Sequence, residues 1–139
     1  MQLTDDQITI IRESHARLLP EVERVSQLFY KDLFQRVPKL KELFADNIGE
    51  QGMRFMSAIG FIVENLDDKT ELNKQTELLA DGHAQFNLRP EAYREMEEAL
   101  VDTFAHALGE HFTNPVELAW RAAFRQICDE MIARTKPPN

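Results

Sequence analysis

Apolar residues recur at intervals of three and four along most of the chain, as Val22, Val25, Phe29 and Leu33 do. This spacing places them on one face of an α-helix, whereas few segments show the period-two alternation of a half-buried strand. Prolines and glycines number only 6 and 5 in the 139 residues, so few positions interrupt the helical pattern. The sequence therefore predicts an all-α fold.

Helix breakers divide this pattern into about six to eight predicted helices. Thr4-Asp5-Asp6-Gln7 has the capping-box pattern that begins a helix. Pro20-Glu21 suits the first turn of a second helix. Val37-Pro38 ends that helix, because the residue before proline avoids the αR region. A short turn is predicted at 39–44, followed by a polar loop at 45–50, a long helix at 51–66 and a loop at 67–70. Further breaks are predicted at 87–90, at Gly109 and at 112–115, and a frayed tail at 135–139.

The length, charge and N-terminus place the chain in a broad class. A length of 139 residues with 43% hydrophobic residues suits one domain spanning 1–139. The formal charge of −8 argues against binding to nucleic acid or to an anionic membrane. The N-terminus lacks the regions of a signal peptide, and the longest apolar run, 58–63, is too short to span a membrane. We therefore expect a cytoplasmic protein with no nucleic-acid or membrane partner.

Cys128 is the only cysteine, which excludes an intramolecular disulfide and a multi-cysteine metal site. A small buried hydrophobe is the more frequent role of such a residue. The sequence also contains no glycine-rich phosphate loop, GxSxG elbow or HExxH pair. Paired carboxylates such as Glu97-Glu98 are interpreted as part of a solvated helix face.

Two polar residues lie on apolar helix faces without an evident partner in the sequence. In the stretch LADGHAQF, His83 follows Leu79 by one helical turn, and Gln51 precedes Phe55 by the same interval. Burying an unpaired amide or imidazole costs on the order of 1–3 kcal/mol, so each needs a partner. Taken alone, His83 is compatible either with a satisfied core histidine or with a ligand for a bound group.

The other three histidines receive structural interpretations. His15 lies on the apolar face of the first predicted helix and is interpreted as a core residue. His106 and His111 stand among acidic and polar residues and are predicted at the surface.

Several motifs taken together resemble one family. The run Leu28-Phe29-Tyr30-Lys31-Asp32-Leu33-Phe34, followed by Pro38 and Leu43-Phe44, resembles the second helix and following corner of bacterial globins. The resemblance extends over about 4–133 and includes Gln51, Phe55, His83, Tyr93 and Ala119-Trp120. The chain resembles single-domain bacterial haemoglobins and the globin part of flavohaemoglobins. This resemblance implies a three-over-three helical sandwich around a haem.

The resemblance also implies a role for each matching residue. His83 matches the proximal histidine, whose neutral imidazole nitrogen binds haem iron, and Gly82 allows the helix to approach the porphyrin. Tyr30 and Gln51 match the distal pair of hydrogen-bond donors, and Phe55 matches the apolar residue beside the gas ligand. Because no CxxCH motif is present, the implied cofactor is a non-covalent haem b, iron protoporphyrin IX. The other implied haem contacts are the stacking Phe44, Tyr93 near the proximal histidine, and the pocket residues Ile59, Leu79, Leu88, Met96, Leu100 and Phe124.

Three residues depart from the family pattern. Phe55 stands where leucine is usual, which implies a tighter distal pocket. Gly52 stands where flavohaemoglobins often have proline, which implies a looser start of that helix. Thr135 falls where flavohaemoglobins carry a glutamate that makes the iron more electron-rich, so strong oxygen-activating chemistry is not implied.

The resemblance leaves several functions open. The first is reversible oxygen binding for storage, transport or scavenging. The second is nitric oxide dioxygenation, an enzymatic activity for which we expect a separate reductase, because the sequence shows no flavin or nicotinamide domain. A haem-based gas sensor and a haem-free globin-fold interaction protein are further alternatives. The expected ligands are oxygen and other diatomic gases, and the sequence does not specify an oligomeric state.

Overall fold

The computed structural model describes residues 3–44, 48–84, 86 and 88–135, with the side chains at 43, 44, 48 and 135 outside the description. Every regular element within these residues is helical, so the predicted all-α class is confirmed. None of the described helices is long and apolar enough to cross a membrane. In chain order the elements are α1 (Asp5–Leu18), η1 (Leu19–Glu21), α2 (Val22–Arg36), η2 (Pro38–Leu40), α3 (Lys41–Phe44), α4 (Ile48–Glu64), α5 (Lys69–Ala84), α6 (Pro90–Leu108), η3 (Gly109–His111) and α7 (Asn114–Thr135).

Several boundaries lie where the sequence predicts them. Thr4 caps α1 in a complete capping box, in which its side chain accepts from the Gln7 amide and the Gln7 side chain accepts from the Thr4 amide. Helix α2 ends at Arg36, directly before Val37-Pro38. Gly109 follows α6 with a φ of 55°, a conformation that glycine adopts without a Cβ clash.

Three boundaries differ from the prediction. Pro20 lies in the single turn of η1 and not in the first turn of α2. Helix α4 begins at Ile48 rather than Gln51, with Glu50 in a first turn that favours acidic residues. Helix α5 begins at Lys69, inside the predicted loop, because the Asp68 carboxylate accepts a hydrogen bond from the Glu71 amide and so caps the helix. Residues 136–139 of the predicted frayed tail lie outside the described residues.

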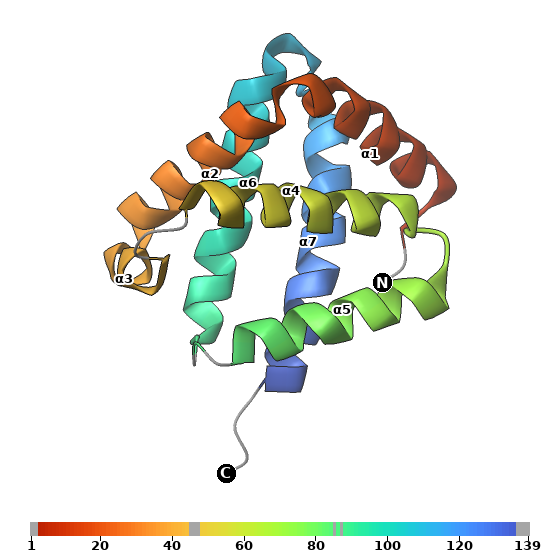
Figure 1. The fold of residues 1–139 in the computed structure, drawn as a ribbon. Coiled ribbons are helices and arrows are strands. Elements are labelled where there is room, and N and C mark those ends of the chain that lie inside the picture. The colour runs from red at the N-terminus through yellow and green to blue at the C-terminus, as the bar shows by residue number, and fades with distance from the viewer. Residues whose placement is uncertain (1–2, 45–47, 85, 87, 136–139) are drawn as a thin grey trace.

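The longer helices pack in two layers. Helices α4 and α5 run across the front of the molecule in Figure 1, and α6 and α7 cross behind them. Helix α2 packs on α4 and α6, while α7 packs on α1, α5 and α6. The main core lies between these helices, with Ile11, Val25, Phe29, Phe104 and Trp120 at 2% exposure or less. The three-over-three arrangement around a haem stays a prediction.

Glu97 corrects the interpretation of the paired carboxylates as a solvated face. Its side chain on α6 is 1% exposed. Both of its oxygens accept hydrogen bonds from the Arg125 guanidinium on α7, at 2.8 and 2.9 Å. The neighbouring Glu98 is half-buried and accepts from Arg121, also on α7. These pairs join α6 to α7, and such bidentate pairing provides the partner that a buried carboxylate requires.

Gly52 marks a close crossing of α2 and α4 rather than a loose start of α4. The residue is buried in the face of α4 that meets α2. A Cβ atom at this position would lie 2.7 Å from Ser26 Oγ and 3.0 Å from Ser26 Cβ. The absence of a side chain therefore lets the two helix backbones approach each other closely.

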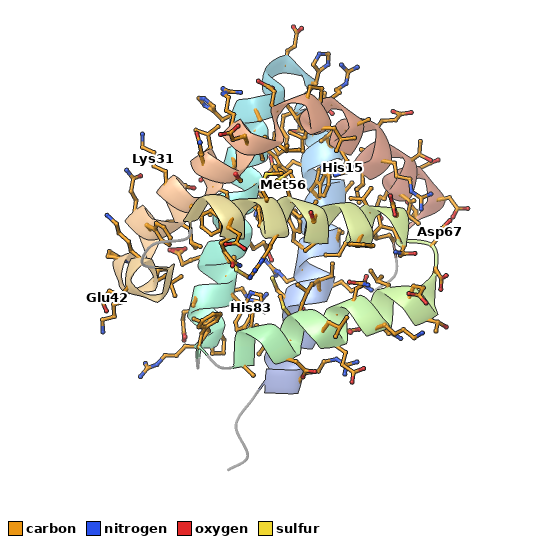
Figure 2. The ribbon with its side chains drawn as sticks, viewed as in Figure 1. His15, Lys31, Glu42, Met56, Asp67 and His83 are labelled. Atoms are coloured by element: carbon orange, nitrogen blue, oxygen red, sulfur yellow. The ribbon has the colours of Figure 1, made fainter. Side chains whose placement is uncertain are left out.

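The structure confirms the predicted surface positions of His106 and His111 and buries His15, which is 9% exposed on α1 (Figure 2). Among the described residues, His15 Nε2 has no hydrogen-bond partner. Burial lowers the pKa of His15 below its ordinary value of 6.5, and the Glu64 carboxylate opposes this effect only in part. The fold therefore favours the neutral imidazole at this position.

We expect His15 to make the fold less stable in mild acid. The unfolded chain takes up a proton at His15 near its ordinary pKa while the folded chain resists, so stability falls as pH decreases below 6.5. When the pH is lowered from about 7.5 to about 5.5, the free energy of unfolding of His15→Leu should fall by less than that of the unsubstituted protein. Urea denaturation at the two pH values measures both changes. His106→Leu, at an exposed site, is the control. Equal acid sensitivity in all three proteins would contradict this prediction.

Candidate functional site

One cavity of about 390 Å³ lies among five helices, α2, α4, α5, α6 and α7. Its wall is largely apolar. The polar or ionisable side chains at its wall are Tyr30, Gln51, Arg54, His83 and Cys128. An apolar pocket with a few convergent polar groups is the usual form of a small-molecule site.

His83 reaches this cavity from the last turn of α5 (Figure 2). Its Nδ1 atom lies 2.7 Å from the backbone oxygen of Leu79, one helical turn earlier. A carbonyl oxygen can only accept, so Nδ1 carries the proton and donates it in this hydrogen bond. When the ring is neutral, this hydrogen bond leaves the lone pair on Nε2, the form in which imidazole binds a metal.

Two aromatic residues contact the His83 ring. The ring of Phe86 stands edge-on to it, with centroids 6.3 Å apart. The ring of Tyr93, which is 1% exposed, lies 6.2 Å away and packs with Ile127 and Met131 of α7. These contacts and the Leu79 hydrogen bond restrict the orientation of the imidazole.

Tyr30 and Gln51 meet across the crossing of α2 and α4. The Tyr30 hydroxyl donates to the backbone oxygen of Gln51 over a long distance of 3.5 Å. Burial raises the pKa of Tyr30 to about 12, and a hydrogen bond with the Gln51 side chain opposes that rise. The phenol is therefore protonated at neutral pH and carries a hydrogen-bond donor at the cavity wall.

Phenylalanine rings surround the Tyr30 phenol. Phe55 of α4 stacks on Phe29 of α2, with ring centroids 4.3 Å apart and planes 6° apart. The Tyr30 ring stands edge-on to Phe29 at 5.0 Å and to Phe55 at 6.0 Å. This arrangement of one stacked pair and two edge contacts is a favoured geometry for aromatic rings.

Ten of the twelve residues predicted as cofactor contacts line the cavity: Tyr30, Gln51, Phe55, Ile59, Leu79, His83, Leu88, Met96, Leu100 and Phe124. Tyr93 is the exception among the described side chains, because it packs beside His83 and does not line the cavity. The Phe44 side chain lies outside the described residues, as does that of Thr135. The roles of these residues toward a cofactor stay predictions.

The cavity wall also contains residues that the sequence reasoning missed. Ile127, Cys128 and Met131 follow Phe124 on α7, and Arg54, Ala58 and Ile62 lie near Gln51 and Phe55 on α4. The other additions are Phe29, Leu33, Leu40, Leu78 and Phe86. Gly82, which the resemblance places near the porphyrin, also lines the cavity. Extending the helical spacing of the predicted contacts would have identified those on α4 and α7. The same spacing would have identified Leu33, three residues after Tyr30, and Phe86, three residues after His83, whereas Phe29, Leu40 and Leu78 have no such signal.

Cys128 and Arg54 mark opposite environments within the cavity wall. Cys128 is 3% exposed, and burial raises the pKa of its thiol to about 12, so the predicted role as a small buried hydrophobe is confirmed. Arg54 is an exposed residue of α4 that pairs with Glu50 at 3.1 Å. The cavity therefore has an apolar interior on the α7 side and a cation where Arg54 meets solvent.

The chain matches known proteins along most of its length. A family model described as Globin matches residues 27–131. The flavohemoprotein of Vibrio cholerae is 30% identical over 135 residues, which cover 95% of this chain and 34% of that protein. An uncharacterized globin-like protein of Aquifex aeolicus is 28% identical over 137 residues, which cover 96% of this chain and 95% of that protein. The chain thus spans about a third of the length of the flavohemoproteins that it matches.

Proposed function

Because this chain belongs to the globin family, we propose that it holds a haem b in the cavity and binds oxygen reversibly. The single observation that carries the proposal is the geometry of His83. Its Nδ1–H is committed to the Leu79 carbonyl, which leaves the lone pair of Nε2 for iron in a cavity that also contains Tyr30 and Gln51.

The residues of the cavity fit such a cofactor. A haem has a large apolar face, which suits a wall made mainly of leucine, isoleucine, phenylalanine and methionine. It also carries two carboxylates, for which Arg54 offers a cation at the solvent-exposed part of the wall. With Cys128 as the only cysteine, His83 would provide the protein's bond to iron, without thioether attachment.

The chain's own residues would determine how a gas ligand is held. Ferrous haem supplies reversible coordination of oxygen, which acquires partial negative charge. The Tyr30 hydroxyl would donate a hydrogen bond to that ligand, with the Gln51 amide as a second donor. Phe29 and Phe55 would exclude water from the same side of the cavity, which slows oxidation of the iron.

The experiment that tests the proposal is repeated oxygenation of the purified protein. We expect about one haem per chain, a Soret band, and full return of the ferrous spectrum through several cycles of oxygen addition and removal. Failure to bind haem would favour the haem-free interaction protein. Conversion to ferric protein within one cycle would overturn reversible oxygen binding.

A second measurement distinguishes oxygen binding from nitric oxide dioxygenation. The oxygenated protein is mixed with nitric oxide, with and without an added flavin reductase, and nitrate is measured. Nitrate that stops near one equivalent in both reactions supports the oxygen-binding function. Sustained nitrate formation that depends on the reductase would instead assign the enzymatic function.

A further inference from the structure

We propose that the stacked pair Phe29–Phe55 is a rigid size filter that admits diatomic ligands and excludes those with bulk beyond the second atom. Phe55 would set the limit, and Phe29 would be a positioning residue that holds the Phe55 ring. This inference deepens the proposed function and depends on haem occupying the cavity.

The first observation is the geometry of the two rings. Their planes are 6° from parallel and their centroids 4.3 Å apart, so each ring covers a face of the other. Phe29 is only 2% exposed and belongs to the main core, which fixes its position. Rotation of the Phe55 ring would break this stack and its edge contact with Tyr30, so this side chain yields less readily than an aliphatic one.

The second observation is the close crossing that brings the two rings together. Gly52 lies one turn before Phe55 on α4, and Ser26 lies one turn before Phe29 on α2. A Cβ at Gly52 would come within 2.7 Å of Ser26 Oγ, so the helices could not cross this closely with a larger residue there. The Gly52–Ser26 contact and the Phe29–Phe55 stack thus lie one helical turn apart in the same contact between α2 and α4.

The third observation is the position of Phe55 relative to the polar groups of the site. Phe55, Tyr30 and His83 line the same cavity from three different helices. The Tyr30 ring stands edge-on to Phe55 at 6.0 Å, so the ring and the phenol border the same part of the wall. A gas ligand that accepts a hydrogen bond from Tyr30 would therefore lie beside Phe55, and a longer ligand would need that ring to move.

The test compares alkyl isocyanides of increasing length with carbon monoxide on the ferrous haem protein. The unsubstituted protein should bind n-butyl isocyanide much more weakly than methyl isocyanide. Phe55→Leu should raise the ratio of butyl to methyl affinity by about ten-fold or more, because overpacking a well-packed site has costs of this size. Phe61→Leu, at an exposed ring on the same helix, is the matched control and should leave the ratio unchanged.

The positioning role of Phe29 has its own readout. Phe29→Leu should raise the same ratio in the unsubstituted background but not in the Phe55→Leu background, because it acts through that ring. Carbon monoxide binding and helical circular dichroism report whether each variant folds and holds haem. Phe29→Met replaces Phe29→Leu if the latter does not retain haem.

The outcomes separate this inference from the proposed function. A wild-type protein that binds haem and carbon monoxide but shows equal affinity for all isocyanides would overturn the size filter and leave the proposed function intact. Additive effects of Phe29→Leu and Phe55→Leu would overturn the positioning role. A protein that retains no haem would overturn both.

Discussion

His83→Ala is expected to lose its haem roughly a hundred-fold faster than the unsubstituted protein, or not to retain it through purification. The variant removes the nitrogen whose lone pair the Leu79 hydrogen bond leaves for iron. Loss of a partner that merely orients a metal ligand costs about 10–100-fold in metal affinity, so loss of the ligand should cost at least as much. Transfer of haem to an excess of a haem-scavenging apoprotein, followed in the Soret band, measures the rate.

Two controls make the His83 result specific. His106→Ala removes an exposed histidine of α6 and should leave haem transfer unchanged. Added imidazole should partly restore the ferrous spectrum of His83→Ala, because it supplies the missing nitrogen to the cavity that the substitution leaves. Normal haem content and an unchanged ferrous spectrum in His83→Ala would remove this residue from the proximal role.

The parts of the fold that follow local rules could be predicted from the sequence. The capping box at Thr4 and the proline at position 38 act through neighbouring residues, and both boundaries lie as predicted. The apolar face predicted for the first helix, on which His15 lies, is buried in α1, where Ile11 and Leu18 are fully buried. The Asp68 cap of α5 is equally local, but it was not identified from the sequence. The predicted loop at 67–70 therefore extended into the first turn of that helix.

Features that depend on contacts between distant helices could not be predicted in this way. Glu97 resembles a solvated carboxylate in the sequence because its partner Arg125 lies on another helix, and only packing brings the two together. The same holds for the Phe29–Phe55 stack, whose rings come from α2 and α4. The candidate site is intermediate, since family resemblance selected ten cavity residues but not the wall formed by Ile127 and Met131.

Tyr30→Phe is expected to speed oxygen dissociation by roughly ten- to a hundred-fold, because a hydrogen bond to a charged group contributes about 1.5–3 kcal/mol. The substitution removes the hydroxyl and keeps the ring, so the edge contacts with Phe29 and Phe55 should persist. Carbon monoxide is less polar when coordinated, and its dissociation should change much less. Stopped-flow displacement of each gas measures both rates.

The pH dependence of oxygen release provides an independent check on the Tyr30 assignment. Burial raises the pKa of Tyr30 to about 12, so the phenol keeps its proton and remains a donor throughout the neutral and moderately alkaline range. Release from the unsubstituted protein should therefore show no acceleration from loss of this donor until the pH approaches that value. The 3.5 Å bond to the Gln51 carbonyl is long enough that a charged acceptor in the cavity should replace it. Unaltered oxygen release in Tyr30→Phe, together with faster release in Gln51→Leu, would transfer the donor role to Gln51.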